Sequence, residues 1–255
     1  MRQQYMKNKR IVACVILHYG AEWFTHALRS VQSCVDEVVV VYSAKPSFGH
    51  ATNEPCPESE SALKACVQDW HNVTWYRHET FRNEGYHRDW AYDRCRDHHK
   101  ADYMIVADPD EIWDTQMLVD TLVWAEDNFT TKYLRIGMQH FWRSVGYVCR
   151  DPIIPIRIIN FNAYEGEQYA PNANTPTIHH MGYAQSSKIV MYKWKIHGHL
   201  YEMRDGWIGK FANWKPMTLD VHPTNKDFWH PASFDRREIQ HLIGDHPYYN
   251  LDIIP

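Results

Sequence analysis

Three carboxylates crowd one short stretch of the chain, ADYMIVADPDEIWD at residues 101–114. The apolar run YMIVA is typical of a short buried strand, and Asp108, Asp110 and Glu111 follow it directly. Carboxylates this close repel one another, so they are tolerated best in water, at a helix start or around a cation. Carboxylate oxygens suit Mg²⁺ or Mn²⁺, although a D-x-D pattern alone is a weak motif. The alternative is that the acidic segment only starts the next helix, with Asp114 as its N-cap.

The elements that must position these carboxylates alternate between strand and helix over residues 10–128. Apolar runs such as RIVACVIL and DEVVVVY predict strands covered on both faces, and the stretches between them carry apolar residues at helical spacing. This alternation predicts βαβ units and an α/β fold with a mainly parallel sheet flanked by helices. Ligands of such sheets bind beyond the carboxyl ends of the strands, where the acidic segment falls.

The second half of the chain, residues 129–255, is rich in aromatic residues. We expect longer strands or irregular segments at YLRIGMQHFWRSVGY, PIRIINF and IVMYKWKIHGH, and a short final helix at FDRREIQHLI. No clear linker separates the two halves, so we expect a single domain over residues 1–255.

Composition limits the function classes. The net charge of -4 gives no global basic surface for nucleic acid, although a local patch is not excluded. The six cysteines contain no C-x-x-C pair, which favours reduced thiols and a cytoplasmic protein over a disulfide framework. No stretch approaches the roughly 20 apolar residues of a transmembrane helix, and we find no signal peptide.

The order of the motifs resembles the GT-A fold of family 2-like glycosyltransferases. The matching pieces are VILHYGAEWFTHALRSV, DEVVVVYS, NEGYHRDWAYDRC, YMIVADPDEIW and IHHMGYAQSSKIVMYKWKIHGH, which cover roughly residues 10–200. The resemblance implies a Rossmann-like mixed sheet in which residues 10–128 bind a nucleotide sugar and residues 129–255 bind an acceptor. It also implies transfer of a hexosyl or pentosyl group from a nucleoside-diphosphate donor to an acceptor hydroxyl. The implied cofactors are Mn²⁺ or Mg²⁺ and a nucleotide sugar, with a UDP-sugar as the expected donor.

The same resemblance suggests roles for the acidic segment and the helix before it. Asp110 is the expected metal ligand, and Asp108 is expected to contact the ribose or to help bind the metal. Glu111 is expected to orient the cluster or to bind an acceptor hydroxyl. Arg88 and Asp89 match positions near the nucleotide; the alternative for Arg88 is a solvated helix charge.

Further nucleotide and metal contacts are expected at the ends of other strands. Tyr19 is expected to stack on the base, and Ser43 to take part of the role of an Asp that the family usually carries after its second strand. His180 or His197 is expected to complete the metal shell. Two adjacent histidines on a strand face opposite ways, so only one of His179 and His180 can point into the site.

The catalytic base and the acceptor stay open. Transfer with inversion needs a carboxylate that deprotonates the acceptor hydroxyl, and a retaining mechanism is the alternative. Glu167 and Asp205 are favoured because Tyr169 and Trp207 nearby could form a sugar platform; the other candidates are Asp151, Glu165 and Glu202.

The expected acceptor is a glycan, a lipid-linked sugar or a small molecule, held by the aromatic C-terminal half. A viral-type glycosyltransferase that modifies a hydroxymethylated base in DNA is an alternative, because aromatic and basic side chains also grip exposed bases. A non-catalytic nucleotide- or carbohydrate-binding protein is a second alternative.

Overall fold

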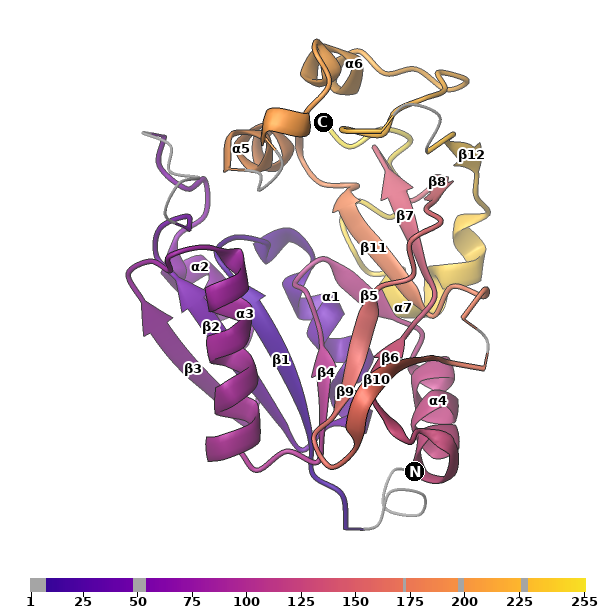
Figure 1. The fold of residues 1–255 in the computed structure, drawn as a ribbon. Coiled ribbons are helices and arrows are strands. Elements are labelled where there is room, and N and C mark those ends of the chain that lie inside the picture. Colours follow the sequence, from indigo (N-terminus) through magenta and orange to yellow (C-terminus); the bar gives the residue numbers. More distant parts are fainter. Residues whose placement is uncertain (1–7, 48–53, 172, 197–199, 226–228) are drawn as a thin grey trace.

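The computed structural model describes residues 8–47, 54–171, 173–196, 200–225 and 229–255. Within them, one sheet of seven strands and one of five pack together with helices. Figure 1 shows the larger sheet in the lower part of the molecule and the smaller sheet above it, with α5 (Ser187–Ile196) and α6 (Trp207–Ala212) at the top. No helix in the described residues is both long enough and apolar enough to cross a lipid bilayer.

The larger sheet confirms the predicted mixed, mainly parallel arrangement. Its strands are β1 (Ile11–Leu17), β2 (Glu37–Ser43), β3 (Val73–His78), β4 (Tyr103–Val106), β6 (Thr131–Arg135), β9 (Ile156–Asn160) and β10 (Tyr164–Tyr169). They lie in the order β10-β6-β9-β4-β1-β2-β3. The first four strands in the chain run parallel to one another, whereas β9 runs antiparallel to both β4 and β6. The carboxyl ends of β1, β2 and β4 therefore meet at one edge.

Helices cover both faces of the larger sheet near β1. The remaining helices are α1 (Ala21–Val31), α2 (Glu60–Ala65), α3 (Glu84–Asp93), α4 (Thr115–Asn128) and α7 (Gln240–Ile243). Alternate residues of β1 pack on opposite sides: Ala13 belongs to a core with α1 and α4, and Cys14 to a core with α3. The side chain of Asp114 caps α4, as the sequence predicts, and the side chain of Asn83 caps α3.

The smaller sheet is built from segments that are distant in the sequence. Its strands are β5 (Glu111–Trp113), β7 (Met138–Trp142), β8 (Tyr147–Arg150), β11 (Ile178–Tyr183) and β12 (Ala232–Ser233). They lie in the order β12-β8-β7-β11-β5. A four-residue turn from Asp108 to Glu111 links β4 of the larger sheet directly to β5 of the smaller one, and the Glu111 amide donates to the Asp108 carbonyl at 3.0 Å. The acidic segment is thus the covalent junction between the two sheets.

Two predictions for the second half are wrong. The run from Ser187 to Ile196 is helix α5 and not a strand or irregular segment. The tryptophans expected on an acceptor surface instead form a core: Trp207, Trp214 and Trp229 are at most 5% exposed, and Trp194 stacks on Trp207 at 5.0 Å. Burying such large rings away from water stabilises this part of the fold but removes them as a sugar platform.

Candidate functional site

A cavity of about 390 Å³ opens at the carboxyl ends of β1, β2 and β4. Six of the residues predicted from the sequence line it: Tyr19, Ser43, Arg88, Asp108, Asp110 and His180. They come from five separate parts of the chain, so the fold is what brings them together. Its size is in the range of small-molecule sites, and its position is the one expected for ligands of an open α/β sheet.

Asp110 lies almost buried between groups from the other side of the cavity. Its Oδ1 is 3.5 Å from His180 Nε2, and its Oδ2 accepts from Gln185 Nε2 at 3.0 Å and lies 3.7 Å from Lys193 Nζ. Burial alone would raise the pKa of Asp110, but the charges of His180 and Lys193 outweigh it and hold the pKa well below its ordinary value. Asp110 is therefore a carboxylate at neutral pH.

Lys193 brings a positive charge into the cavity from α5. Burial would lower the pKa of Lys193, but Tyr19 and Asp110 beside it outweigh that effect, and the pKa lies above its ordinary value. The ammonium group also lies 5.0 Å from the ring centre of Tyr183. A half-buried, charged lysine that lines a cavity is a ready partner for phosphate.

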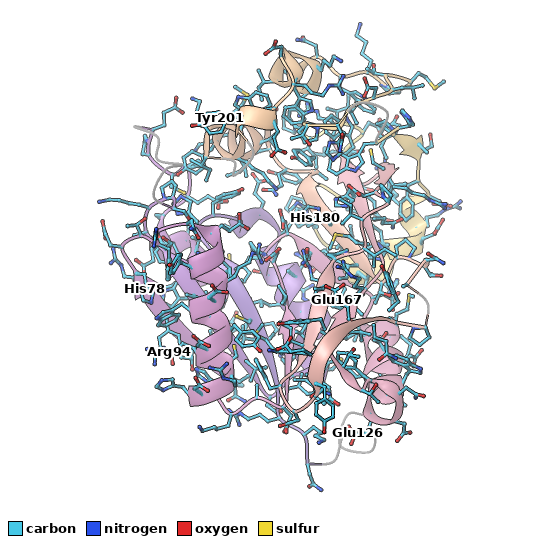
Figure 2. The ribbon with its side chains drawn as sticks, viewed as in Figure 1. His78, Arg94, Glu126, Glu167, His180 and Tyr201 are labelled. Carbon is cyan, nitrogen blue, oxygen red and sulfur yellow. The ribbon has the colours of Figure 1, made fainter. Side chains whose placement is uncertain are left out.

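The ring of His180 is placed by its neighbours on the smaller sheet. Its Nδ1 lies 2.7 Å from Nδ1 of His140, which leaves Nε2 facing Asp110. Gly182 makes room for this ring, because a Cβ there would lie 2.6 Å from His180 Nε2 and 3.0 Å from Lys193 Nζ. Figure 2 shows His180 on β11, at the level where the two sheets meet.

Two arginines hold the other acidic residues of the turn. Arg157 from β9 contacts both Glu111 carboxylate oxygens, and its Nη2 lies 3.3 Å from Asp108 Oδ2. Arg88 Nη1 lies 4.0 Å from Asp108 Oδ1 on the other side. Of the two roles expected for Glu111, its complete burial fits orientation of the cluster and not contact with an acceptor hydroxyl. Its carboxylate instead anchors Arg157, which in turn orients Asp108.

The loop after β1 forms the opposite wall. Gly20 has a φ of 131°, and a Cβ there would come within 2.7 Å of the Pro109 side chain, so only glycine lets this loop approach the acidic turn. The amides of Gly20 and Ala21 both donate to Glu58 Oε2, at 2.5 and 3.0 Å. The N-terminus of α1 is thus already occupied by a carboxylate.

Tyr19 and Ser43 line the cavity in different ways. Tyr19 packs edge-on against Tyr192 at 5.9 Å, which fixes its ring in the cavity wall. The Ser43 hydroxyl donates to the Lys45 carbonyl at 2.6 Å, and the Ser43 carbonyl contacts His18 Nδ1 at 2.7 Å. The hydroxyl of Ser43 therefore stabilises the loop that follows β2.

Asp89, Glu167 and Asp205 do not line this cavity. Asp89 lines a neighbouring cavity behind α3. Glu167 lies on β10 and accepts from Arg135 Nε at 2.8 Å (Figure 2), and Asp205 lies exposed before α6. Because neither carboxylate lines the cavity, the structure does not support them as bases there. His197 lies outside the described residues.

Sequence reasoning missed Lys193, Gln185, His140 and Arg157. One signal was available for Lys193, since Ile189, Lys193 and Ile196 follow the spacing of one helix face and not that of a strand. The other three depend on strand register and on the packing of the two sheets, which no local pattern encodes.

The residues around Asp110 suit a divalent cation in part. Within the described residues, no group of three or more His, Cys, Asp or Glu side chains is arranged to hold a metal ion. Two ligand atoms on one ion, each about 2.1 Å from it, lie about 3.0–3.4 Å apart, close to the 3.5 Å between Asp110 and His180. The buried Oε1 of Gln185, next to Asp110, accepts no hydrogen bond from the described residues. Among the described residues, Asp110 and His180 would thus be the two ligands, and other oxygens, such as those of substrate or water, would have to complete the shell.

Comparisons with known proteins show distant structural similarity. No protein-family model matches the chain, and no curated protein sequence matches it. The chain is similar to residues 1–349 of S. aureus TarS, with a TM-score of 0.39 and 16% identity over 51% of this chain and 36% of that one. It is also similar to Mycobacterium tuberculosis glucosyl-3-phosphoglycerate synthase in complex with Mn²⁺, UDP-glucose and phosphoglyceric acid, with a TM-score of 0.35 and 14% identity over 53% of this chain and 44% of that one.

The chain thus spans less than half of the length of either protein. The strand order and the side-chain contacts of this chain, and not these similarities, define its fold and its site.

Proposed function

We propose that this protein is a glycosyltransferase that moves a sugar from a nucleoside-diphosphate donor to an acceptor hydroxyl. One observation carries the proposal: Asp110, His180 and Lys193 converge in a single cavity at the carboxyl ends of parallel strands. A carboxylate with an imidazole suits a divalent cation, and an ammonium group beside them suits phosphate oxygens. The motif order given above supports the same class.

In this proposal Asp110 and His180 hold Mn²⁺ or Mg²⁺. When bound, the cation would neutralise charge on the departing diphosphate. Asp108, fixed between Arg88 and Arg157, accepts hydrogen bonds from the ribose or from metal-bound water. Lys193 contacts the diphosphate, and its charge stabilises the leaving group as the sugar departs.

The loop after β1 and the end of β2 receive the nucleoside. Tyr19 presents its ring to the base, for which uracil is the expected partner. Leu17, His18 and Pro46 complete the wall on that side. An aromatic face and apolar atoms suit a flat base.

Glu84 replaces Glu167 and Asp205 as the candidate base for an inverting transfer. It lines the cavity outside the acidic turn. Its carboxylate pairs with Arg88 at 2.7 Å, with the Glu84 side chain 57% exposed and the Arg88 side chain 42% exposed. Exposed ion pairs of this kind contribute little to stability, so a substrate hydroxyl can displace Arg88 from Glu84 at small cost.

Binding of the proposed donor is tested by thermal unfolding with Mn²⁺ and UDP. At a ligand concentration about 100 times the dissociation constant, binding adds about 2.7 kcal/mol and should raise Tm by roughly 5–10 °C. We expect Asp110→Asn, which keeps the size of the side chain, to lose this shift. Asp120→Asn, an exposed change on α4, should retain it. A shift that survives in Asp110→Asn, or is absent from the wild type, contradicts the proposal.

Catalysis is tested separately by release of UDP from UDP-glucose in the presence of Mn²⁺. Release that depends on an added acceptor would identify a transferase, and a panel of glycans run beside hydroxymethylcytosine-containing DNA would separate the two acceptor classes. Donor binding without release from any nucleotide sugar in the panel would leave a binding protein.

A further inference from the structure

One face of the larger sheet is only partly covered by helix. On this face Ala91 of α3 belongs to the same core as Cys14 of β1, and His87 of α3 contacts the Val41 carbonyl of β2 at 2.8 Å. A helix is about 10 Å wide and neighbouring strands lie about 4.8 Å apart, so one helix covers about two strands. Figure 1 shows α3 in front of β1 and β2, and no other described helix in front of β4 and β9.

Apolar side chains of three further strands continue this face beyond α3. Met104 of β4 is paired with Ile159 of β9, and Ile159 is paired with Tyr133 of β6. Paired residues of adjacent strands project from the same face, and Val106 follows Met104 on that face at the two-residue period of a strand. These four side chains belong to the same core as Cys14. The sheet thus has an apolar surface wider than the helix that covers it.

A cavity of about 460 Å³ lies between this surface and α3. Its lining includes Cys14, Met104 and Ile159 from the sheet and Ala91 from the helix, each of which is at most 7% exposed. The volume is in the range of small-molecule sites, and such sites are lined mainly by apolar and aromatic side chains. The cavity is therefore large enough and apolar enough to bind the body of a small molecule.

Cationic side chains outnumber carboxylates in the lining of this cavity. Arg88, Arg157 and Lys132 line it, against the exposed carboxylate of Asp89. The two arginines already contact the Asp108 carboxylate, at 4.0 and 3.3 Å. An excess of positive charge at an apolar cavity favours a ligand that carries an anionic group.

Lys132 is the cation best placed to pair with such a group. Its Nζ lies 5.4 Å from the ring centres of both Tyr92 and Tyr133, which also line the cavity. It pairs with Glu165, whose side chain is 72% exposed. Exposed ion pairs contribute little to stability, so a ligand anion can replace Glu165 at small cost.

We propose that this cavity binds a small molecule with an aromatic body and one anionic group, such as a carboxylate. The body packs against Met104 and Ile159, and the anionic group pairs with Lys132. The site is distinct from the cavity at the carboxyl ends of the strands, although Ile16 and Arg88 line both. The inference does not depend on the proposed function, because it uses neither a metal ion nor a nucleotide.

The chemical class of the ligand is tested by isothermal titration calorimetry with 2-naphthoate and with its neutral analogue naphthalene-2-carboxamide. We expect the wild type to bind 2-naphthoate roughly 10–100-fold more tightly than the carboxamide, because a hydrogen bond to a charged group is lost with the carboxylate. Lys132→Met should remove this preference, whereas Lys210→Met, an exposed change on α6, should keep it. No binding of 2-naphthoate to the wild type, or equal affinity for the two probes, overturns the proposal.

The location of the probe is tested by filling the cavity. Ala91→Leu places additional carbons where the probe would lie, and we expect it to weaken binding of 2-naphthoate at least about tenfold. Ala65→Leu, an exposed change on α2, is the matched control and should bind as the wild type does. Unchanged binding in Ala91→Leu overturns the proposal.

A measurement on the wild type keeps the test valid if a variant folds poorly. The methyl signal of Met104 is identified in ¹³C NMR spectra by its absence from Met104→Leu. We expect nuclear Overhauser effects between the ring protons of 2-naphthoate and this methyl group, and none to the methyl group of Met181, which is buried in another core. Bound probe that shows no such effect to Met104, or that excess UDP displaces from another place, overturns the proposal.

Discussion

At Asp110, one buried carboxylate is held by an imidazole, an amide and an ammonium group. His180 and the ammonium of Lys193 compensate the negative charge, which offsets the free-energy cost of burying the carboxylate. The same ammonium is available to phosphate when a divalent cation takes over the charge of Asp110. Lys193 therefore contributes both to the stability of the fold around Asp110 and to the proposed binding of diphosphate.

Replacing Lys193 by methionine should weaken diphosphate binding selectively. A hydrogen bond to a charged group contributes about 1.5–3 kcal/mol, so we expect roughly 10–100-fold weaker binding of UDP, and unchanged binding of uridine. Isothermal titration calorimetry with both ligands measures this difference. Lys188→Met, an exposed change on the same helix, is the matched control. Equal losses for UDP and uridine would show that Lys193 supports the fold and does not contact phosphate.

The acidic residues, Tyr19 and Arg88 could be predicted from the sequence because each lies at a recognisable strand end or helix. Aromatic neighbours in the sequence do not place Glu167 and Asp205 at the cavity, because Trp207 belongs to a core and Glu167 pairs with Arg135 on the larger sheet. His140 could not be predicted, because its approach to His180 depends on the pairing of β7 with β11.

Among the elements, the turn between β4 and β5 depends on the helix that follows it. α4 packs on the larger sheet through Leu118, Leu122 and Ala125, and its first turn is capped by the Asp114 side chain, which accepts from the Met117 amide at 2.9 Å. A capped, packed α4 fixes β5 at its carboxyl end. The acidic turn is thereby held between two firmly placed elements.

Removing the side chain that caps α4 should therefore lower the free energy of unfolding of the protein. We expect Asp114→Ala to lower the free energy of unfolding by about 1 kcal/mol, because the Met117 amide loses its acceptor. Asp127→Ala, near the exposed end of the same helix, should change it by less than about 0.5 kcal/mol. Urea unfolding of both variants measures the difference. Similar values for the two would show that the cap contributes nothing beyond a surface carboxylate.

The element order over residues 10–128 could be predicted because each strand and helix there has its own local pattern. In the second half the pattern fails for a physical reason. β11 pairs with β7 and β5, both of which are distant from it in the sequence, so its hydrogen bonding is decided by tertiary packing. Helix α5 is not predicted for a similar reason. Its lysines and aromatic residues are also compatible with a strand, and only its packing in the folded protein favours the helix.

Across the whole molecule, several histidines are buried without charge. His87 Nε2 contacts the Val41 carbonyl at 2.8 Å, His246 Nε2 contacts the Glu22 carbonyl at 2.7 Å, and His179 lies in the smaller sheet. Burial lowers the pKa of each of the three to about 4. They lie in different parts of the fold, so the protonation of each opposes folding at a separate place.

Stability should consequently fall as the pH is lowered from about 6.5 to about 4. These pKa values are lower in the folded than in the unfolded protein, so the unfolded state binds more protons in this window, and the contribution of the histidines to the loss levels off below it. Each histidine accounts for up to roughly 3 kcal/mol. The measurement is the free energy of urea unfolding at several pH values. His87→Gln, whose amide can still donate to Val41, should reduce the slope, whereas exposed His71→Gln should not; a flat profile contradicts the prediction.

The lack of space between Gly182 and the His180 side chain limits which related sequences can form the same cavity. Position 182 has no room for a methyl group, because His180 Nε2 and Lys193 Nζ already fill it. A homologous chain with alanine or a larger residue there must carry its histidine and lysine elsewhere. Glycine at position 182 can therefore be used to select homologous sequences. Sequences that carry it are able to form the same cavity, whereas sequences without it share at most the sheets of the fold.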